Sequence, residues 1–467
     1  MSLVSSSHRV RSLLRNCVLA LAVSTVSVTA TAQSSSSSDD DKGGASSIFG
    51  ENDTPFTAYV GLDVDGMRHS ALITRENTQD DGNGNPATMR VRELDYERYR
   101  VRFTPRIDVG LARMIGVYAK LPIVAYDTTT IRYTSGTDST NSTVGRDSAP
   151  NPVNNITGWG TTTGFVDNTG SGNAYSPDGT GYGYPNKAYN DWRFDVANNA
   201  GFTGQRAGLD YPTVGLWLAP VSNRTDPSKP TIRINVDFKP CIVLGVMDPD
   251  GDELSDTRPG PVADGACRLH IGTYFSKRFL FLDPYFEANY TLPFAGPDAA
   301  YGFEPRHDGG FTLGLRIVPW ELPAIGSWVA VDMHARAHYF SKGRDYSELS
   351  DALRELTYTD EFMRTSFNAG LHYQVFRYMR VSLVGSFVYD TQHFLSSESV
   401  GCDGGCRPPD VFPWDHNTGP LSDKVELEES ANERNQFFNP IYDTPGRRFI
   451  AENSYQLRLL AKVAFTF

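Results

Sequence analysis

Arginines recur at alternate positions in one short segment of the chain. Arg98, Arg100 and Arg102 are followed by Arg106 and Asp108 in the same phase. Side chains two residues apart in an extended strand point to the same face, so these guanidinium groups would line one surface. Rings of Arg and Lys favour anionic solutes where such a surface lines a pore. The chemistry indicated is the recognition and passage of charged solutes.

Basic residues occupy matching positions in other alternating segments. The candidate lining and selectivity residues are Arg98, Arg100, Arg102, Arg106, Lys120, Arg233, Arg268, Arg316, Asp332, Arg336, Arg458 and Lys462. Acidic residues in the same phase are fewer, and Asp63 and Asp65 belong to the first segment. Opposite charges on neighbouring strands stabilise a sheet whatever passes through it. Cross-strand pairing is therefore the alternative to an anion-preferring path, and the two are not exclusive.

Motifs for metal binding or catalysis are weak. His334 and His338 share a face with Asp332, but four strand residues separate the histidines by about 13 Å, too far to hold one ion. Hydrogen bonding inside a lumen is the better interpretation. Phosphate loops, nucleophile elbows and His-Glu metalloprotease motifs are missing from the sequence. We predict no enzyme activity, no cofactor and no metal, apart from the weak calcium candidate that follows.

That candidate is an acidic run in a predicted loop. Asp248, Asp250 and Asp252 alternate as the ligands of a calcium loop do, but the Gly of the sharp turn and a closing bidentate Glu are missing. A solvated acidic loop is the main prediction.

The N-terminus predicts export. Residues 1–32 combine Arg9, Arg11 and Arg15 with a short apolar core and an Ala-Thr-Ala ending, as a secretory signal peptide does. Residues 33–54 are low in complexity and polar, which predicts a disordered leader.

Four cysteines remain once the signal is removed. An even number in an exported chain favours disulfides. The local pairs are Cys241 with Cys267 and Cys402 with Cys406. Zinc is the rival, but no histidine lies at ligand spacing.

Residues 55–467 repeat one pattern of alternating apolar and polar positions. In residues 231–239, Ile232, Ile234, Val236 and Phe238 alternate with charged and polar residues, which indicates half-buried strands. Such strands are predicted near 56–66, 97–111, 115–133, 209–220, 231–240, 266–275, 281–292, 310–319, 326–340, 362–375, 379–393 and 454–467. A soluble sandwich would also alternate, but its polar faces rarely carry so many charges in register. In a bilayer, the apolar face looks outward and the polar face lines a lumen.

Connection lengths and the last strand favour the membrane interpretation. Short connections are predicted near residues 112–114, 223–229, 276–279, 320–324 and 376–378, as for periplasmic turns. Long ones are predicted near 135–207, 241–265, 294–308, 342–360 and 396–453, as for extracellular loops. Tyr455, Phe465 and Phe467 lie on the apolar face of the last strand. This ending resembles the signal by which the barrel-insertion machinery recognises Gram-negative outer-membrane β-barrels.

Composition excludes two other classes. The 467 residues have a net charge of -12, which argues against a nucleic-acid binder. The chain has no apolar stretch of about 18 residues or more, which excludes a helical membrane protein.

The fold class predicted is all-β, a closed antiparallel transmembrane barrel of about twelve strands in the cell outer membrane. The chain resembles Gram-negative outer-membrane β-barrel proteins as a class. A more specific likeness is to outer-membrane transporters of aromatic-degradation pathways, through the strand-turn-strand run of residues 107–127. The resemblance implies a channel or substrate-specific porin for small solutes, with lipid and the insertion machinery as its partners and no nucleic acid. The alternative is a closed barrel that acts as an interaction or assembly scaffold through its long loops.

Overall fold

The computed structural model describes most of the predicted barrel domain. The described residues are 58–80, 86–112, 114–138, 142–144, 192–194, 201–221, 229–242, 245–250, 254, 259–322, 324–376, 378–399, 437, 439, 442–443 and 445–467. The predicted signal peptide and polar leader lie outside these residues, as do Cys402 and Cys406.

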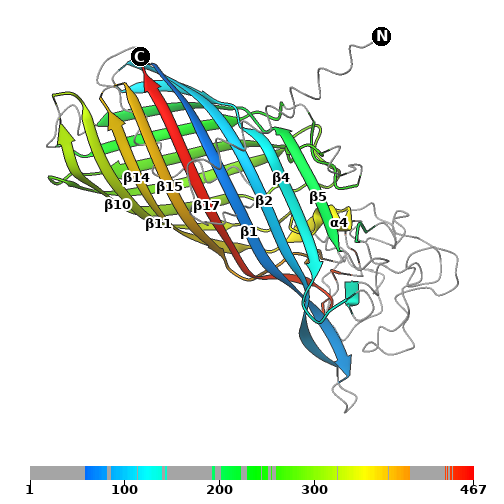
Figure 1. The fold of residues 1–467 in the computed structure, drawn as a ribbon. Coiled ribbons are helices and arrows are strands. Elements are labelled where there is room, and N and C mark those ends of the chain that lie inside the picture. Colours follow the sequence, from blue (N-terminus) through cyan, green and yellow to red (C-terminus); the bar gives the residue numbers. More distant parts are fainter. Residues whose placement is uncertain are drawn as a thin grey trace, which may run out of the picture.

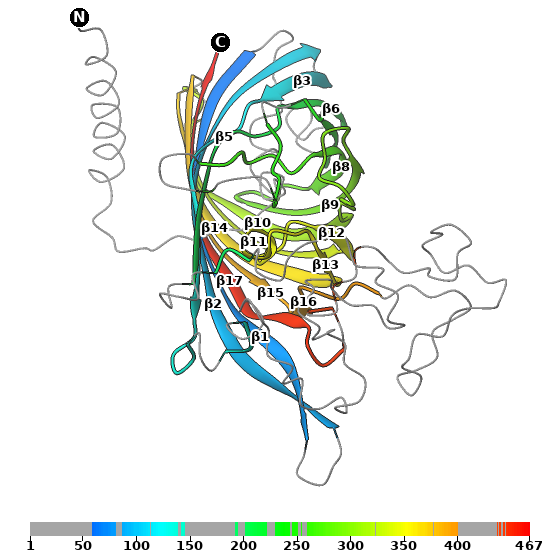
Figure 2. The same ribbon diagram turned by 90° about the vertical axis from the view of Figure 1, so that its right-hand side faces the viewer.

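Twelve antiparallel passes of the described chain form one barrel (Figures 1 and 2). In chain order they are β1 (Ala58–Asp80), β2 (Pro86–Ala112), β3 (Ile115–Lys120) continued by β4 (Ile123–Tyr133), β5 (Phe202–Leu209) continued by β6 (Thr213–Val221), β7 (Thr231–Lys239), β8 (Ala266–Ser276), β9 (Leu282–Ala295), β10 (Asp308–Leu322), β11 (Ser327–Phe340), β14 (Phe362–Val375), β15 (Met379–Asp390) and β17 (Phe449–Thr466). Strand β1 pairs with both β2 and β17, which closes the sheet. The predicted closed barrel of about twelve strands is confirmed.

Both ends of the barrel chain lie at the same rim. The backbone N–H of Ala58 donates to the Phe467 carbonyl at 3.3 Å, and the Phe467 N–H donates back to Ala58 at 2.9 Å. The short connections predicted from the sequence lie at this rim too. The predicted long ones lie at the other rim, as does the link between β1 and β2. By the usual arrangement of outer-membrane barrels, the rim with short turns is periplasmic.

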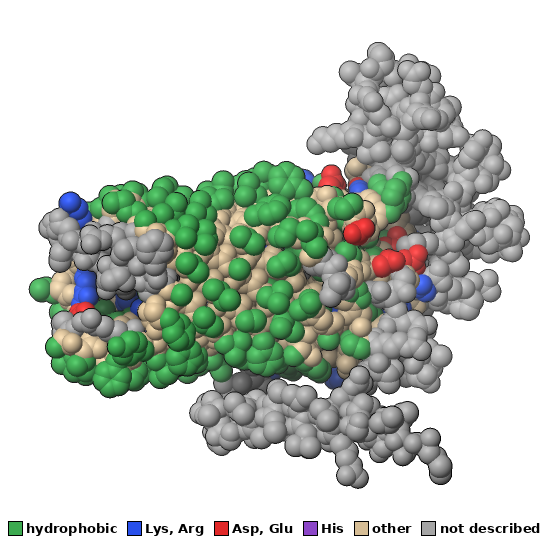
Figure 3. Space-filling view, turned by 90° about the horizontal axis from the view of Figure 1, so that it is seen from above, with side chains coloured by type: hydrophobic (Ala, Val, Ile, Leu, Met, Phe, Trp, Pro, Cys, Tyr) green, Lys and Arg blue, Asp and Glu red, His purple; other side chains and the backbone are tan. Residues whose placement is uncertain are grey.

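The outer face of the wall is apolar. Phe238 keeps 47% of its surface exposed and Val331 keeps 37%, whereas a sandwich would have hidden both. Apolar side chains cover the flank of the barrel, and the coloured charges gather near its two ends (Figure 3). A closed sheet leaves no unpaired backbone edge in lipid, and its apolar band matches the hydrocarbon layer. The chain is an outer-membrane β-barrel. Among the described residues, no helix is both long and apolar enough to cross a membrane.

Two passes are interrupted near prolines. Pro122 separates β3 from β4, and Pro212 precedes β6. Because proline has no backbone N–H to donate to a ladder, the ladder between these two neighbouring passes is interrupted here. Strand β3 pairs with β6, and β4 pairs with β5.

Several strands run further toward the extracellular side than the sequence predicts. Strands β1 and β2 continue as a long hairpin, which includes residues 67–74 and 89–95. Strand β5 begins at Phe202 and β17 at Phe449, within segments predicted as loop. Apolar alternation weakens at these ends because they extend past the lipid, where both faces contact protein or water.

Parts of the long loops fold over the extracellular mouth. Strand β12 (Gly343–Asp345) pairs with β13 (Thr357–Thr359), the short helix α4 (Ser350–Leu353) lies between them in sequence, and β16 (His393–Phe394) pairs with β17. Residues 142–144, 192–194, 343–359, 393–399 and 442–443 are called the cap below.

The cap has its own apolar core. Buried Trp192, Leu349, Leu353 and Tyr442 join one cluster with Ile73, Leu94 and Phe449 of the barrel strands. Apolar side chains from distant segments therefore pack together at the mouth, which hydrophobic burial stabilises.

Candidate functional site: the lumen and the mouth pocket

The predicted basic residues face the interior of the barrel, and many are bound to acids. Arg102 and Arg458 lie on the two neighbours of β1, and both contact Asp65 Oδ2, at 3.3 and 3.1 Å. Lys462 Nζ lies 3.3 Å from Asp63 Oδ2. The register places Asp65 opposite Arg102 and Asp63 opposite Lys462. The cross-strand pairing proposed as the alternative is present at these residues.

A second cluster spans β9, β10 and β11. Arg316 lies 3.4 Å from carboxylate oxygens of both Asp283 and Asp332. Asp332 also accepts a hydrogen bond from the Tyr285 hydroxyl at 2.8 Å and contacts His334 Nδ1 at 2.9 Å. His334 therefore takes part in a hydrogen-bond network, as predicted. The described residues contain no group of three His, Cys, Asp or Glu placed to hold a metal.

The other predicted lining residues contact neighbours of several kinds. Arg106 donates to Asp108 at 2.6 Å, and Arg336 donates to the Thr312 hydroxyl at 3.3 Å. Arg233 Nε donates to Asn235 Oδ1 at 2.7 Å, Lys120 Nζ lies 5.5 Å from the centre of the Tyr118 ring, and Arg268 is bound to Asp264. Carboxylates thus neutralise part of the basic lining, while Arg233, Arg336 and Lys120 also contact neutral groups. A role for these residues in selecting solutes stays a prediction.

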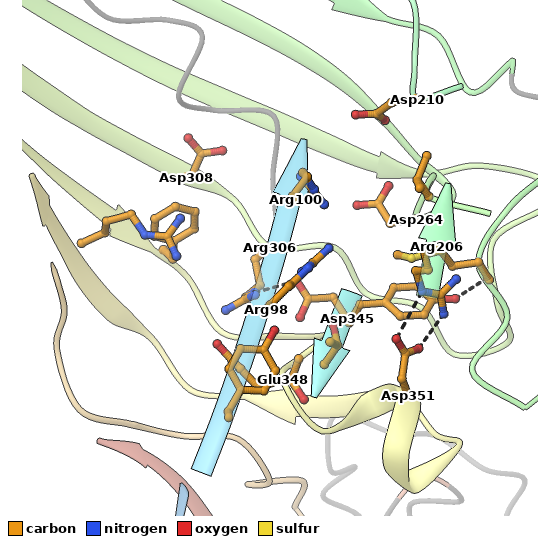
Figure 4. A pocket seen from close by; sticks show the side chains of 18 of the residues that line it. Arg98, Arg100, Arg206, Asp210, Asp264, Arg306, Asp308, Asp345, Glu348 and Asp351 are labelled. Atoms are coloured by element: carbon orange, nitrogen blue, oxygen red, sulfur yellow. Dashed lines mark hydrogen bonds and ion pairs between the residues drawn. The ribbon is translucent and has the colours of Figure 1, made fainter. Parts of the chain in front are cut away.

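A pocket of about 110 Å³ lies between the barrel wall and the cap (Figure 4). Strand β2 contributes Tyr96, Arg98 and Arg100, and the cap contributes residues in and next to α4, among them Asp351 and Glu348. Its charged lining comprises Arg98, Arg100, Arg206, Arg268, Arg306, Arg364, Asp210, Asp264, Asp308, Asp345, Glu348 and Asp351. Six guanidinium groups face six carboxyl groups. We call this the mouth pocket.

Aromatic rings form part of the pocket wall. The rings of Phe340 and Phe362 stack at 4.9 Å between centroids, and the Arg364 guanidinium lies 4.9 Å from the centre of the Phe340 ring. Tyr346 closes another side, where its hydroxyl donates to the Met247 carbonyl. The pocket therefore combines fixed charges with flat apolar surfaces, as small-molecule sites do.

Polar contacts fasten the cap to the barrel. Arg206 Nε on β5 donates to Asp351 Oδ2 at 3.2 Å. Within the cap itself, Arg344 Nε donates to Glu398 Oε2 at 2.7 Å. Glu93 on β2 accepts a hydrogen bond from the Thr143 hydroxyl at 2.8 Å. These charge-assisted contacts hold the cap in one position over the pocket.

The Asp345 carboxyl in the cap has a perturbed acidity. Burial raises the pKa of Asp345 to about 6, although the Arg306 guanidinium acts in the opposite direction. Arg306 Nε donates to Asp345 Oδ2 at 2.6 Å. Desolvation of the charged form is the larger effect here. The cap therefore holds a carboxyl group that titrates close to neutral pH.

Sequence reasoning identified only part of the mouth pocket. Arg98, Arg100 and Arg268 were found through strand alternation, but Arg206, Arg306 and the acids of the cap were not. Those residues lie in segments predicted only as extracellular loops, and their approach depends on contacts such as Arg206 with Asp351, 145 residues apart. No short-range pattern signals such a contact.

The remaining predicted sites have mixed outcomes. The Cys241–Cys267 disulfide is present and joins the end of β7 to the start of β8. In the calcium candidate, Asp250 lies 3.3 Å from Arg354 and its backbone N–H donates to Asp248 Oδ1 at 3.0 Å, while Asp252 lies outside the described residues. Tyr455, Phe465 and Phe467 are exposed on the outer face, and their part in assembly stays a prediction.

Comparisons with known proteins give only distant similarity. No protein-family model and no curated protein sequence matches the chain. An outer membrane channel from Pseudomonas putida superposes with a TM-score of 0.38 at 10% identity, over 90% of this chain and 98% of that one. A FadL homologue from Pseudomonas aeruginosa gives 0.28 at 8% identity, over 89% and 90% of the two chains. A mutant of the TodX monoaromatic hydrocarbon channel gives 0.28 at 11% identity, over 88% and 91%. Similarity at this level assigns the chain to none of their families.

Proposed function

We propose that this protein is a substrate-selective outer-membrane channel for small solutes, gated by its cap. The observation that carries the proposal is a closed barrel with an interior lined by charged side chains and a capped pocket at its extracellular mouth. A barrel that served only as an anchor would need no charged interior, because burying ion pairs stabilises a fold little or not at all. A solute that enters from outside would meet the mouth pocket first and the paired charges of the lumen next.

An anion preference is the finer part of this proposal. Its support is the number of Arg and Lys residues on the inward faces, which would attract anions where their charges are not fully neutralised. The bound carboxylates reduce that preference, since Asp65 serves two arginines and Asp63 binds Lys462. We therefore expect a weak preference for anions. A reversal potential that indicates cation selectivity in a KCl gradient would exclude it.

Planar-bilayer recording of the refolded mature protein tests the channel itself. We expect discrete conductance steps that become more frequent when the cap is loosened. Persistent silence from protein that is folded by circular dichroism would favour the alternative, a scaffold that acts through its loops.

A further inference from the structure

Four arginines of the mouth pocket are each neutralised by one acid. Arg206 binds Asp351, Arg268 binds Asp264, Arg306 binds Asp345, and Arg364 binds Asp390. These pairs add no net charge to the pocket. The charge available to a solute must come from the remaining lining residues.

One side of the pocket keeps a surplus positive charge. Arg98 and Arg100 share a single carboxylate, Asp127, at 2.7 and 3.0 Å. Arg100 is only 8% exposed. Among the described residues, its one side-chain hydrogen bond uses Nε and leaves the two terminal nitrogens without an acceptor. Figure 4 shows Arg100 on β2 with its guanidinium group in the pocket.

Three lining carboxylates remain. Asp308 lies 3.8 Å from His338 Nδ1, and the other two supply the opposite charge. Within the described part of the chain, Asp210 accepts a hydrogen bond only from the backbone N–H of Tyr211, at 2.7 Å, and Glu348 accepts none. Both line the pocket, as Arg100 does, and neither forms an ion pair with a described residue. A buried guanidinium with free donors and carboxylates with free acceptors therefore face one small space.

We propose that the mouth pocket binds small zwitterionic solutes, with a carboxylate on Arg100 and an ammonium group on Glu348 or Asp210. A guanidinium group matches a carboxylate in shape and charge, and an ammonium group satisfies carboxylate acceptors. Tyr96, Phe340 and Tyr346 would contact the apolar body of the solute. This inference rests on the proposed channel function and specifies its substrate class.

Calorimetric titration of the full mature protein in detergent tests the proposal with three matched probes. L-valine carries both charges, isobutylamine lacks the carboxylate, and isovalerate lacks the ammonium group. Loss of one charge-assisted contact in a buried site should weaken binding by about tenfold or more. We expect L-valine to bind best. Arg100→Gln should reduce L-valine binding toward that of isobutylamine, and Glu348→Gln toward that of isovalerate.

Arg90→Gln is the matched control, because Arg90 lies on the same strand, is exposed and pairs with Glu452 outside the pocket. It should bind L-valine as the wild type does. Equal binding of all three probes, or no L-valine binding by protein that conducts ions, would overturn the zwitterion site and leave the channel standing. Silence in planar bilayers would instead count against the channel.

Discussion

The barrel wall and the extracellular mouth are held together by different means. In the wall, each residue's environment follows from its position in an alternating strand, so that Arg102 and Asp65 meet because the register makes them opposite. At the mouth, the apolar core joins segments from residue 71 to residue 451. In the wall, local sequence periodicity is enough to position the charged side chains of the lumen. At the mouth, the positions of the pocket residues depend on packing between segments far apart in sequence.

The largest effect is expected where one wall acid serves two arginines. Asp65→Asn leaves Arg102 and Arg458 buried without that carboxylate, and breaking a buried ion pair costs about 3–5 kcal/mol. Denaturant unfolding measures the change in the free energy of unfolding. Glu97→Gln is the comparison, because Glu97 and Arg68 form a half-exposed pair, which should contribute under about 1 kcal/mol. Equal losses of unfolding free energy in the two variants would show that the buried Asp65 contacts stabilise the protein no more than the Glu97–Arg68 pair does.

The disulfide should matter to the mouth more than to the wall. Replacing Cys241 and Cys267 with serine removes a crosslink across 26 residues, which the chain-entropy model values at about 3–4 kcal/mol. Limited proteolysis should cut the connection between β7 and β8 in the variant and spare it in the wild type. Cleavage at the same rate in both proteins would contradict this assignment.

A cavity in the cap core should loosen the mouth alone. Leu353 is fully buried against the cap, and Leu353→Ala should cost about 2–3 kcal/mol, toward the low end for such changes because a short helix can settle into the space. Hydrogen exchange should rise in residues 343–359 and stay unchanged in β10 and β11. Leu313→Ala, on the lipid-facing side of β10, is the control and should leave exchange in the cap unaltered.

The smallest effect is a pH dependence of the cap. The pKa of Asp345 is raised to about 6 from an ordinary value of 3.8, so the folded cap binds this proton more tightly than the unfolded one. The stabilisation is complete below pH 4 and is lost as the pH rises through about 6. Hydrogen exchange in the cap should therefore be faster at pH 7.5 than at pH 5 after correction for intrinsic rates. Asp345→Asn should remove most of that difference, and an unchanged difference would exclude Asp345 as its source.

The sequence predicts the wall well because its information is local. Alternation gave the inward set from Arg98 to Lys462 and the closed barrel, and spacing gave the Cys241–Cys267 bridge. The extracellular ends of β1, β2, β5 and β17 were missed because period two fades where strands leave lipid. The mouth pocket was largely missed because the contact of Asp351 with Arg206 depends on the packing of α4 in the cap core, between segments far apart in sequence.

The most direct test is the single-channel conductance of the wild type and of Leu353→Ala in the same bilayers. It asks whether solutes pass through the barrel interior and whether the cap controls their entry. We expect rare openings in the wild type and longer or more frequent openings of the same type in the variant. Identical traces from two folded proteins, with the cap shown by hydrogen exchange to be loosened in the variant, would contradict this expectation.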